Sequence, residues 1–506
     1  MYHIPRFLSS RILPLFSYVF PSFRTSALLP IRHFSLPVDI PSCSIYNRYI
    51  IRYKGVFTML SNRVWALTPA KIILGGFFLI ITAGALLLTL PISSKSGEMT
   101  PFIDAFFTAT SATCVTGLVV HDTYTYWSVF GQSVILLLIQ IGGMGVVTLA
   151  IAITILSGRK IGLKQRFVMQ ESISAPQVGG IVRMTNFIIK GTLLLELIGA
   201  FIMAVQFCPQ FGVIKGIWFS IFHSISAFCN AGFDLMGGTS GLYSSLTSYH
   251  SNPLIVVPVM LLIVVGGIGF FVWDDIIQHR ETRRAFRLQT KVVLTYTFFL
   301  ILIPAVLFFL FEFTPQRWEG YSLADRLYAS FFQSVTPRTA GFNTVPLDGL
   351  STQAQLLTIM LMIIGGSPGS TAGGIKTTTF AVALLCIRSV FQNQEGIHCY
   401  KRRIPYEILR NAIAILVLYL SLFLAASFLI TWADGVTLME SSFEAASAIA
   451  TVGLSLGITE DLSLFSKMIL ILLMYFGRVG GLTMLYALTN HKKFPFHLPE
   501  EKITVG

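Results

Sequence analysis

Four short stretches of the sequence place small hydroxyl, amide or apolar residues directly before a glycine. They read "SATCVTGL" (111–118), "FCNAGFD" (228–234), "TPRTAGFNT" (336–344) and "ATVGLSLG" (450–457). Glycine reaches backbone dihedral angles that are closed to other residues, so it can turn carbonyl oxygens inward without a Cβ in the way. Carbonyl oxygens that face a common path can replace the water shell of a cation. The four stretches therefore predict a cation pathway lined by backbone oxygens.

The four glycines recur with nearly one period. Gly117, Gly232, Gly341 and Gly453 are separated by 115, 109 and 112 residues, and each has a phenylalanine ten residues before it. A fixed period indicates repeated architecture. The run between each phenylalanine and its glycine is too short to span a membrane but long enough for a helix of two to three turns. We expect each repeat to contain a membrane helix, a short re-entrant helix, a polar loop and a second membrane helix.

Irregular backbone at membrane depth is unfavourable unless it lines a water-filled path. Four such loops can meet on one axis, where each short helix would direct its partly negative C-terminus at a cation. The candidate filter residues are Thr113, Cys114, Val115, Thr116, Gly117, Cys229, Asn230, Ala231, Gly232, Arg338, Thr339, Ala340, Gly341, Ala450, Thr451, Val452 and Gly453.

Eight apolar runs could supply the membrane helices. The chain has a mean hydropathy of +0.72, which excludes a water-soluble globular protein. A helix needs about 20 apolar residues to cross a bilayer of about 30 Å. The runs lie at 70–90, 129–156, 187–207, 253–273, 292–311, 355–385 (interrupted), 412–432 and 468–488. The predicted fold is an all-α polytopic membrane protein with four helix–pore-loop–helix units around one central pore, that is, eight spanning helices and four re-entrant pore helices.

The charged residues predict the orientation. The formal net charge of +13 could indicate nucleic-acid binding, but its distribution favours the positive-inside bias of a membrane protein. Successive loops between the apolar runs should lie on alternate sides of the membrane. The loops of one side, together with the C-terminal tail, hold nineteen Lys and Arg, whereas the loops of the other side hold six. Both termini are therefore expected in the cytoplasm.

The N-terminal segment is treated separately. Residues 1–58 are rich in Arg, Ser and aromatics and hold one acid, Asp39, which is the composition of a transit peptide. An upstream start before Met59 is the alternative explanation. The expected divisions are 1–58 (extension), 64–158, 183–280, 288–390 and 405–490 (repeats 1 to 4) and 491–506 (cytoplasmic tail). The six cysteines show no metal-site or disulfide spacing.

The four glycine stretches resemble the pore loops of the Trk/Ktr/HKT superfamily of potassium transporters. The resemblance covers about residues 64–490 and is strongest to the bacterial Ktr/Trk-type membrane subunit, with "LTPAKIILGGF" and "GGSPGSTAGGIKTTT" as further shared features. It implies potassium uptake through the plasma (bacterial inner) membrane, or an organelle membrane if residues 1–58 are a transit segment. Glycine at the first loop, here Gly117, accompanies potassium preference in this superfamily. The resemblance further implies a homodimer on a separate cytosolic nucleotide-binding ring, with K⁺ (or Na⁺) as the transported ion and no covalent cofactor.

The glycine-rich break in the sixth run is a candidate gate. A phosphate-loop interpretation fails, because Ile375 displaces the lysine and no strand precedes the segment. The resemblance places this loop beneath the filter, while a plain packing kink is the alternative. The candidate gate residues are Gly365, Gly366, Ser367, Gly369, Ser370, Thr371, Gly373, Gly374 and Lys376.

Two charged residues lie within the apolar runs. Arg478 should face the pore or a partner, because a charge in the membrane interior costs at least about 2.5 kcal/mol. It could limit cation occupancy, contact the gate loop or pair with backbone carbonyls. Glu196 could couple transport to protons or sodium, or bond a neighbouring helix. Arg338 is expected to brace the third loop from behind, and His121, Asp122 and Asp234 to be solvated residues at the outer mouth.

The sequence is also compatible, to different degrees, with three other functions. A sodium-permeable or sodium-coupled transporter of the same fold is the nearest alternative. A secondary transporter of an organic solute would be built on two-fold repeats, whereas this chain has four. A membrane enzyme would need clustered His, Asp or Glu at the membrane face, and the sequence has no such cluster.

Overall fold

A computed structural model of the chain describes residues 68–148, 154, 161–172, 179–239, 241–281, 285–488 and 504. Internal contacts divide the chain into residues 1–66 and 67–506, and everything described belongs to the second unit. The predicted N-terminal extension 1–58 lies outside the described residues, as does nearly all of the predicted tail 491–506.

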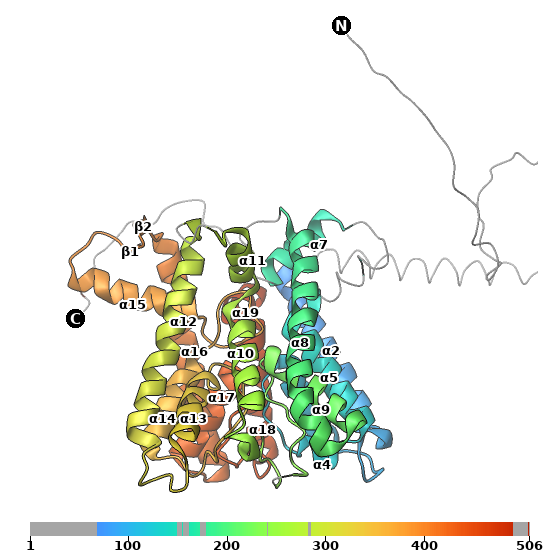
Figure 1. The fold of residues 1–506 in the computed structure, drawn as a ribbon. Coiled ribbons are helices and arrows are strands. Elements are labelled where there is room, and N and C mark those ends of the chain that lie inside the picture. Colours follow the sequence, from blue (N-terminus) through green and yellow to red (C-terminus); the bar gives the residue numbers. More distant parts are fainter. Residues whose placement is uncertain are drawn as a thin grey trace, which may run out of the picture. The chain divides into compact units, whose positions relative to one another are not determined.

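The regular secondary structure of the described residues is almost entirely helical (Figure 1). The α-helices are α2 (Pro69–Thr89), α3 (Phe102–Cys114), α4 (Thr123–Tyr126), α5 (Val129–Met144), α7 (Leu163–Ser172), α8 (Ile181–Phe211), α9 (Val213–Phe228), α10 (Pro253–Ile268), α11 (Phe270–Gln278), α12 (Leu288–Leu307), α13 (Leu323–Val335), α14 (Thr352–Ile363), α15 (Thr377–Phe391), α16 (Tyr406–Asp434), α17 (Leu438–Ala450), α18 (Leu464–Val479) and α19 (Gly481–Leu488). Short turns η1 (Pro91–Ser93), η2 (Thr247–Tyr249) and η4 (Phe308–Glu312) accompany them. An antiparallel hairpin pairs β1 (His398–Cys399) with β2 (Arg402–Arg403).

The helices follow one order four times along the chain. A long helix (α2, α8, α12 or α16) leads to a short helix (α3, α9, α13 or α17), then to a further helix (α5, α10, α14 or α18). Each further helix packs on the short helix of the next group: α5 on α9, α10 on α13, α14 on α17, and α18 back on α3. This last contact closes the four groups into a ring.

Capping residues in the sequence mark the N-termini of several of these helices. Each of α5, α10, α14 and α18 begins after a capping residue whose side chain accepts a backbone N–H: Ser128, Asn252, Ser351 and Ser463. Such caps satisfy N–H groups that have no partner within the helix. The short helices α13 and α17 begin with reciprocal capping boxes, Ser322 with Asp325 and Thr437 with Glu440.

The sequence predicts eight spanning helices, and within the described residues four helices are long and apolar enough to span a membrane: α2, α8, α12 with η4, and α16. The pair α10 and α11 would make a fifth span if it is counted as one, although it bends by 91°. Large apolar side chains such as Leu79, Phe201 and Phe428 are exposed on the long helices, as expected for surfaces that face lipid.

The predicted continuous helices at 129–156, 253–273 and 468–488 are wrong. The structure breaks each at a glycine with positive φ: Gly145 at 86°, Gly269 at 103° and Gly480 at 92°. A positive φ cannot continue a right-handed helix, and glycine adopts it readily. The expected interruption of 355–385 is present, because residues 364–376 separate α14 from α15.

Close approach of backbones fixes how these helices pack. A Cβ added at Gly142, Gly266 or Gly477 would collide with a carbonyl oxygen near the end of a short helix, that of Thr113, Phe228 or Ile449. The three glycines lie in the last turn of α5, α10 and α18, just before the helix breaks. Glycine at these points lets each further helix contact the end of its own short helix.

We expect Gly266→Ala to destabilise the protein, because its Cβ would meet the backbone oxygen of Phe228. Overpacking of this kind costs about 1–3 kcal/mol. Gly75→Ala on α2 is the matched control, since a Cβ there has no atom within 4 Å and alanine is favoured over glycine in helices by about 1 kcal/mol. The midpoint of thermal unfolding in detergent should fall only for Gly266→Ala, and equal midpoints would contradict this packing.

Candidate functional site

The four glycine stretches meet in the structure. A Cβ added at Gly232 would lie 2.8 Å from the carbonyl oxygen of Ala340, and one at Gly341 would lie 2.5 Å from that of Val452. A Cβ at Gly117 would collide with the carbonyl oxygen of Ala231, and one at Gly453 with that of Thr116. Each glycine thus faces the oxygen that precedes the glycine of the next stretch. We call Gly117, Gly232, Gly341 and Gly453 the glycine ring.

All four stretches share one unusual backbone conformation. The residue two positions before each ring glycine has positive φ: Val115 at 58°, Asn230 at 59°, Thr339 at 69° and Thr451 at 54°. Positive φ is uncommon outside glycine and persists only where the surroundings enforce it. The ring glycines also have positive φ, between 70° and 94°. The same strained pair recurs in four unlike sequences, so it is a property of the ring.

Hydroxyl groups at the end of each short helix hold this conformation. Ser111 and Ser447 accept hydrogen bonds from the N–H groups of Gly117 (3.1 Å) and Gly453 (3.0 Å). In the other two stretches the hydroxyl donates to the carbonyl just after the glycine, Ser226 to Phe233 (2.7 Å) and Thr336 to Phe342 (2.6 Å). Sequence analysis missed these four residues. Their regular position, six residues before the glycine in three stretches and five in the third, was the available signal.

One position behind the ring differs in each repeat. The residue nine positions before the glycine is Thr108, His223, Phe332 or Glu444, and all four are buried. His223 Nε2 accepts from the backbone N–H of Leu235 (3.3 Å). The Glu444 carboxylate accepts from Thr459 (3.1 Å) and from Ser455. The polypeptide that follows the ring is therefore held by a different group in the second and fourth repeats.

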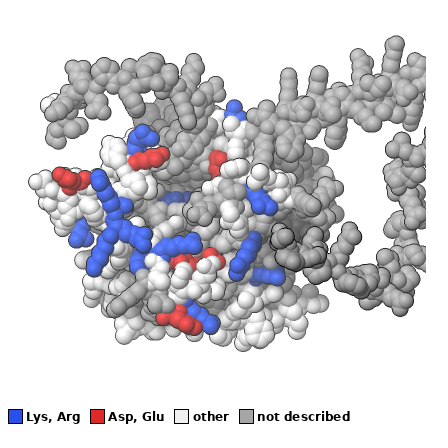
Figure 2. Space-filling view, turned by 90° about the horizontal axis from the view of Figure 1, so that it is seen from above, with Lys and Arg blue, Asp and Glu red and all other residues white. Residues whose placement is uncertain are grey.

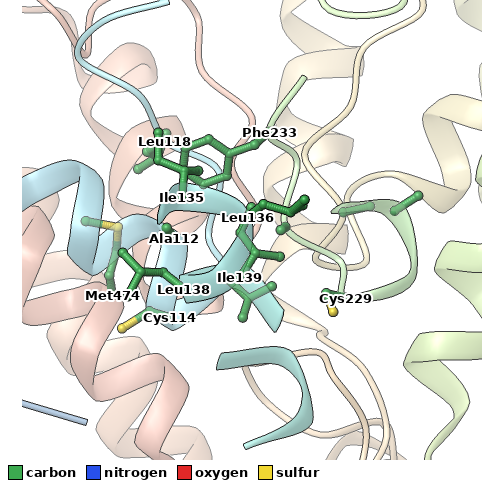
Figure 3. Close-up of a cluster of buried hydrophobic side chains, with 14 of the residues drawn as sticks. Ala112, Cys114, Leu118, Ile135, Leu136, Leu138, Ile139, Cys229, Phe233 and Met474 are labelled. Carbon is green, nitrogen blue, oxygen red and sulfur yellow. The ribbon is translucent and has the colours of Figure 1, made fainter. Parts of the chain in front are cut away.

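Apolar packing surrounds the first two stretches. Figure 3 shows Ile135, Leu138 and Ile139 of α5 beside Ala112 and Cys114 of α3, with Leu118 and Phe233 just beyond the ring glycines. Cys114 and Cys229 are buried free thiols within this packing. Close packing of this kind resists shifts of the loops.

A cavity opens on one side of the ring. It has a volume of about 450 Å³ and is lined by all four ring glycines together with Asp122, Asp234, Asp348 and Glu460. No Lys or Arg is among its described lining residues. We call it the vestibule. Its acidic lining raises the local concentration of cations.

Two acids at this end have shifted pKa values. Burial raises the pKa of Asp234 to about 7, against a hydrogen bond from the Met236 N–H. Asp234 was expected to be an ordinary solvated residue, and the structure instead has it half-buried. The hydrogen bond from His121 lowers the pKa of Asp104, and Lys467 contributes to the lowering.

The glycine-rich segment 365–376 lies on the other side of the ring. Thr371 Oγ1 bonds Asn230 Oδ1 (3.2 Å), and a Cβ at Gly373 would collide with the side chain of Thr451. Asn230 and Thr451 are the residues two positions before ring glycines. The segment therefore contacts the second and fourth stretches directly.

Backbone hydrogen bonds hold this segment in one arrangement. Ser367 N donates to Gly267 O (2.9 Å), Thr371 N donates to Gly266 O (3.3 Å), and Gly369 O accepts from Phe270 N (2.8 Å). Gly365 N also donates to Ile375 O (2.9 Å), which closes the base of the segment. The glycine-rich segment is thus tied at several points to the break between α10 and α11.

Two cations bond to carbonyl oxygens of the segment, Lys376 from within it and Arg478 from α18. Arg478 donates to the carbonyl oxygens of Thr371 and of Gly142 and Gly143, at the end of α5. Lys376 Nζ donates to the carbonyl oxygen of Ala372 at 2.7 Å. Both side chains line a cavity of about 190 Å³ below the segment, which also includes Glu171. Two of the roles considered for Arg478 are therefore present at once: it contacts the glycine-rich segment, and it pairs with backbone carbonyls.

Arg338 and Glu196 are buried charged residues whose side chains contact groups beside the ring glycines, and Glu196 Oε1 accepts from the Cys229 thiol of the second stretch (3.9 Å). The Arg338 guanidinium reaches Thr297 of α12 (3.5 Å) and Thr377 of α15 (3.4 Å). Only its backbone oxygen joins the neighbouring stretch, by accepting from Asn230 Nδ2 (3.4 Å). The Glu196 carboxylate accepts two bonds from the Gln140 amide of α5 (3.1 and 3.2 Å). Among the described residues neither has an ion-pair partner of opposite charge.

A ring of carbonyl oxygens between an acidic vestibule and an inner cavity can hold a partly dehydrated monovalent cation. The buried hydroxyls of Thr113, Thr116 and Thr451 have no hydrogen-bond partner within the described part of the chain. Buried polar atoms are nearly always bonded, so these oxygens leave room for an ion or water. No group of three or more His, Cys, Asp or Glu that could hold a metal ion is found in the same residues.

Comparisons with known proteins agree on one family. A model of the TrkH family, described as a cation transport protein, matches residues 70–495. The chain is 38% identical to the potassium/sodium uptake protein NtpJ of Enterococcus hirae, over 89% of this chain and 100% of that protein. It is 38% identical to Ktr system potassium uptake protein B of Bacillus subtilis, over 87% of this chain and 97% of that one.

A solved structure shares the fold. The crystal structure of the potassium transporter TrkH from Vibrio parahaemolyticus superposes with a TM-score of 0.66 at 20% identity, covering 83% of this chain and 84% of that chain. At this identity the likeness concerns the fold alone.

We expect Gly453→Ala to abolish cation flux, because its Cβ would collide with the carbonyl oxygen of Thr116. Gly457→Ala is a matched control, since Gly457 has nearly the same φ (96° against 94°) but no atom within 4 Å of an added Cβ. Both variants carry the strain of alanine at positive φ, and only Gly453→Ala obstructs the ring. Thallium influx into proteoliposomes should fall at least about tenfold for Gly453→Ala alone, a barrier of about 1.4 kcal/mol. Similar losses in both would mean that strain, not obstruction, limits the flux.

Proposed function

The chain belongs to the TrkH family of cation transport proteins, and from this we propose that it takes up potassium across the membrane through the glycine ring. The ring would act as a selectivity filter in which backbone oxygens replace part of the ion's water shell. The observation that carries the proposal is the cyclic arrangement of the four glycines, each facing the carbonyl oxygen of the next stretch. The four helix groups would then be four repeats around one pore.

Potassium is favoured over other solutes for two reasons. First, two proteins that are 38% identical to this chain, over most of both chains, are named as potassium or potassium/sodium uptake proteins. The vestibule is acidic and the ring oxygens are uncharged, which suits a monovalent cation that must leave again. Sodium is the second candidate, because one of these relatives is named for both ions.

The filter would comprise the predicted residues around the ring. Its backbone would come from the four predicted segments, Thr113 to Gly117, Cys229 to Gly232, Arg338 to Gly341 and Ala450 to Gly453. The C-terminal ends of the four short helices precede these segments, so their partly negative ends favour a cation in the ring. Arg338 would brace the third loop through α12 and α15, because its guanidinium points to Thr297 and Thr377.

The segment 365–376 would act as the gate. Its contacts with Asn230 and Thr451 support a position across the ion path just below the ring. Arg478 bonds the segment to α5, and this contact would hold the closed arrangement. Two cations beneath the ring, Lys376 and Arg478, would also oppose the passage of a cation until the segment moves.

The protein is a multi-pass membrane protein of the plasma-membrane type. We infer that the face in Figure 2 is cytoplasmic, because Lys and Arg side chains are spread over it. Both termini would lie on that side. The expected homodimer and the separate cytosolic nucleotide-binding ring remain proposals that rest on the family resemblance.

We expect Gly117→Ser to reduce the preference for potassium over sodium about tenfold, a change of about 1.4 kcal/mol between the two ions. A side chain at Gly117 would meet the carbonyl oxygen of Ala231 and displace one of the four ring oxygens. Gly457→Ser serves as the control at an unobstructed glycine of similar φ. The potassium-to-sodium permeability ratio would be measured in proteoliposomes, and an unchanged ratio for Gly117→Ser would place the filter elsewhere.

Removal of residues within 367–373 should raise potassium flux and reduce its dependence on a regulatory partner, because fewer contacts would hold the segment below the ring. Arg478→Ala should act in the same direction without shortening the chain, since it removes the donors to Thr371 and Gly142. Arg410→Ala, on an exposed part of α16, is the charge-matched control. Rubidium uptake by equal amounts of inserted protein is the measurement. If the shortened chain and Arg478→Ala both took up rubidium at the rate of the unmodified protein, the segment would be a packing element and not a gate.

A further inference from the structure

A second, separate site lies at the opposite end of the molecule from the vestibule. It is a cavity of about 450 Å³ lined by residues of α12, α15 and the β1–β2 hairpin. Its polar lining includes Arg388, His398 and Lys401 together with the hydroxyl groups of Thr295, Ser389 and Tyr400. No Asp or Glu is among the described residues that line it. A pocket with the two cations Arg388 and Lys401, a histidine and no acid is suited to a phosphate group.

The hairpin is held over this pocket in a strained form. Tyr400 and Lys401, the two residues at its tip, both have positive φ, at 48° and 61°. Tight hairpin turns of this kind usually carry Asn or Gly. The Tyr400 hydroxyl is bonded to Thr295 Oγ1 of α12 at 2.6 Å, which keeps the tip in place. Such strain persists where the surroundings enforce it and often accompanies a binding function.

The helices that form the pocket also carry exposed apolar side chains. On α15, Leu384, Ile387 and Phe391 share one helical face and are exposed, Phe391 by 87%. On α12, Phe298 and Phe299 are exposed one turn from Thr295. In Figure 1, α15 lies across the direction of the upright helices, near the end that carries the hairpin. A helix with this orientation and one apolar face is typical of the membrane interface.

We propose that this pocket binds the phosphate-bearing headgroup of an anionic membrane phospholipid, whose acyl chains lie along the exposed apolar faces of α12 and α15. Arg388 and Lys401 supply the positive charge, and His398 adds a ring nitrogen. Thr295 and Tyr400 share one hydrogen bond, which leaves one O–H of the pair for the headgroup, whereas the Ser389 hydroxyl donates to the carbonyl oxygen of Gly396 (2.9 Å). The adjoining apolar surface favours a lipid over free phosphate, because a soluble anion would leave that surface uncovered. Basic pockets beside membrane helices on the cytoplasmic side bind anionic headgroups in this way.

The test uses purified full-length protein in detergent, titrated with dioleoyl phosphatidylglycerol and, separately, with dioleoyl phosphatidylcholine. We expect phosphatidylglycerol to raise the midpoint of thermal unfolding more than phosphatidylcholine does. In the double variant Arg388→Gln with Lys401→Gln, the lipid concentration needed for this rise should increase at least about tenfold, because two cations contribute to headgroup binding. The single variant Lys401→Gln, at the exposed tip, should show a smaller increase and covers the case in which the double variant fails to fold.

The matched control is Arg402→Gln with Arg410→Gln, which removes the same charge from exposed positions outside the pocket lining. Equal losses in the pocket and control variants would reduce the effect to net surface charge and overturn the proposal. Soluble glycerol phosphate should not reproduce the rise, and if it does, the pocket binds free phosphate esters and not lipid. If the pocket variants keep full lipid response but lose capture of a cytosolic regulatory protein, the site is a protein contact and the lipid proposal is wrong.

Discussion

The structure depends on the absence of side chains where four polypeptide segments cross. At each crossing, the carbonyl oxygen of one segment occupies the space that a Cβ of the next would need. The positive φ at the ring glycines and two residues before them follows from this, as do the hydroxyl groups of Ser111, Ser226, Thr336 and Ser447 that hold it. Further glycines at positions 142, 266 and 477 let the surrounding helices approach closely enough to support the crossing.

Backbone carbonyl oxygens and hydroxyl groups also stabilise the buried positive charges. Arg478 and Arg338 are matched by backbone carbonyls and hydroxyls, with no carboxylate bonded to them among the described residues. Acidic side chains are instead concentrated in the vestibule, on the other side of the ring. The result is a change of sign along the axis, from acids outside the ring to cations inside it. In the proposed pathway, this change of sign would draw a cation toward the ring and oppose it just beyond.

The sequence predicted the recurring pattern but not its irregularities. The spacing of Gly117, Gly232, Gly341 and Gly453 was enough to predict four loops, because only a repeated unit keeps such a period. Hydropathy extended three helices too far, since the residues on both sides of Gly145, Gly269 and Gly480 are equally apolar and a single glycine does not always end a helix. The hydrogen bonds of Arg478 to Thr371 and Gly142 join residues more than 100 positions apart, which no local pattern could reveal. The hairpin pocket likewise depends on residues brought together from positions 295 to 401.

The position nine residues before each ring glycine has an evolutionary consequence. In a pore assembled from four identical chains, any substitution appears four times at once. In the pore proposed for this protein, one chain contributes Thr108, His223, Phe332 and Glu444 to corresponding places, so each quarter of that pore can change by itself. Gene duplication followed by divergence could therefore adjust the ion preference of such a pore in steps of a quarter, with three quarters left intact to preserve function at every step.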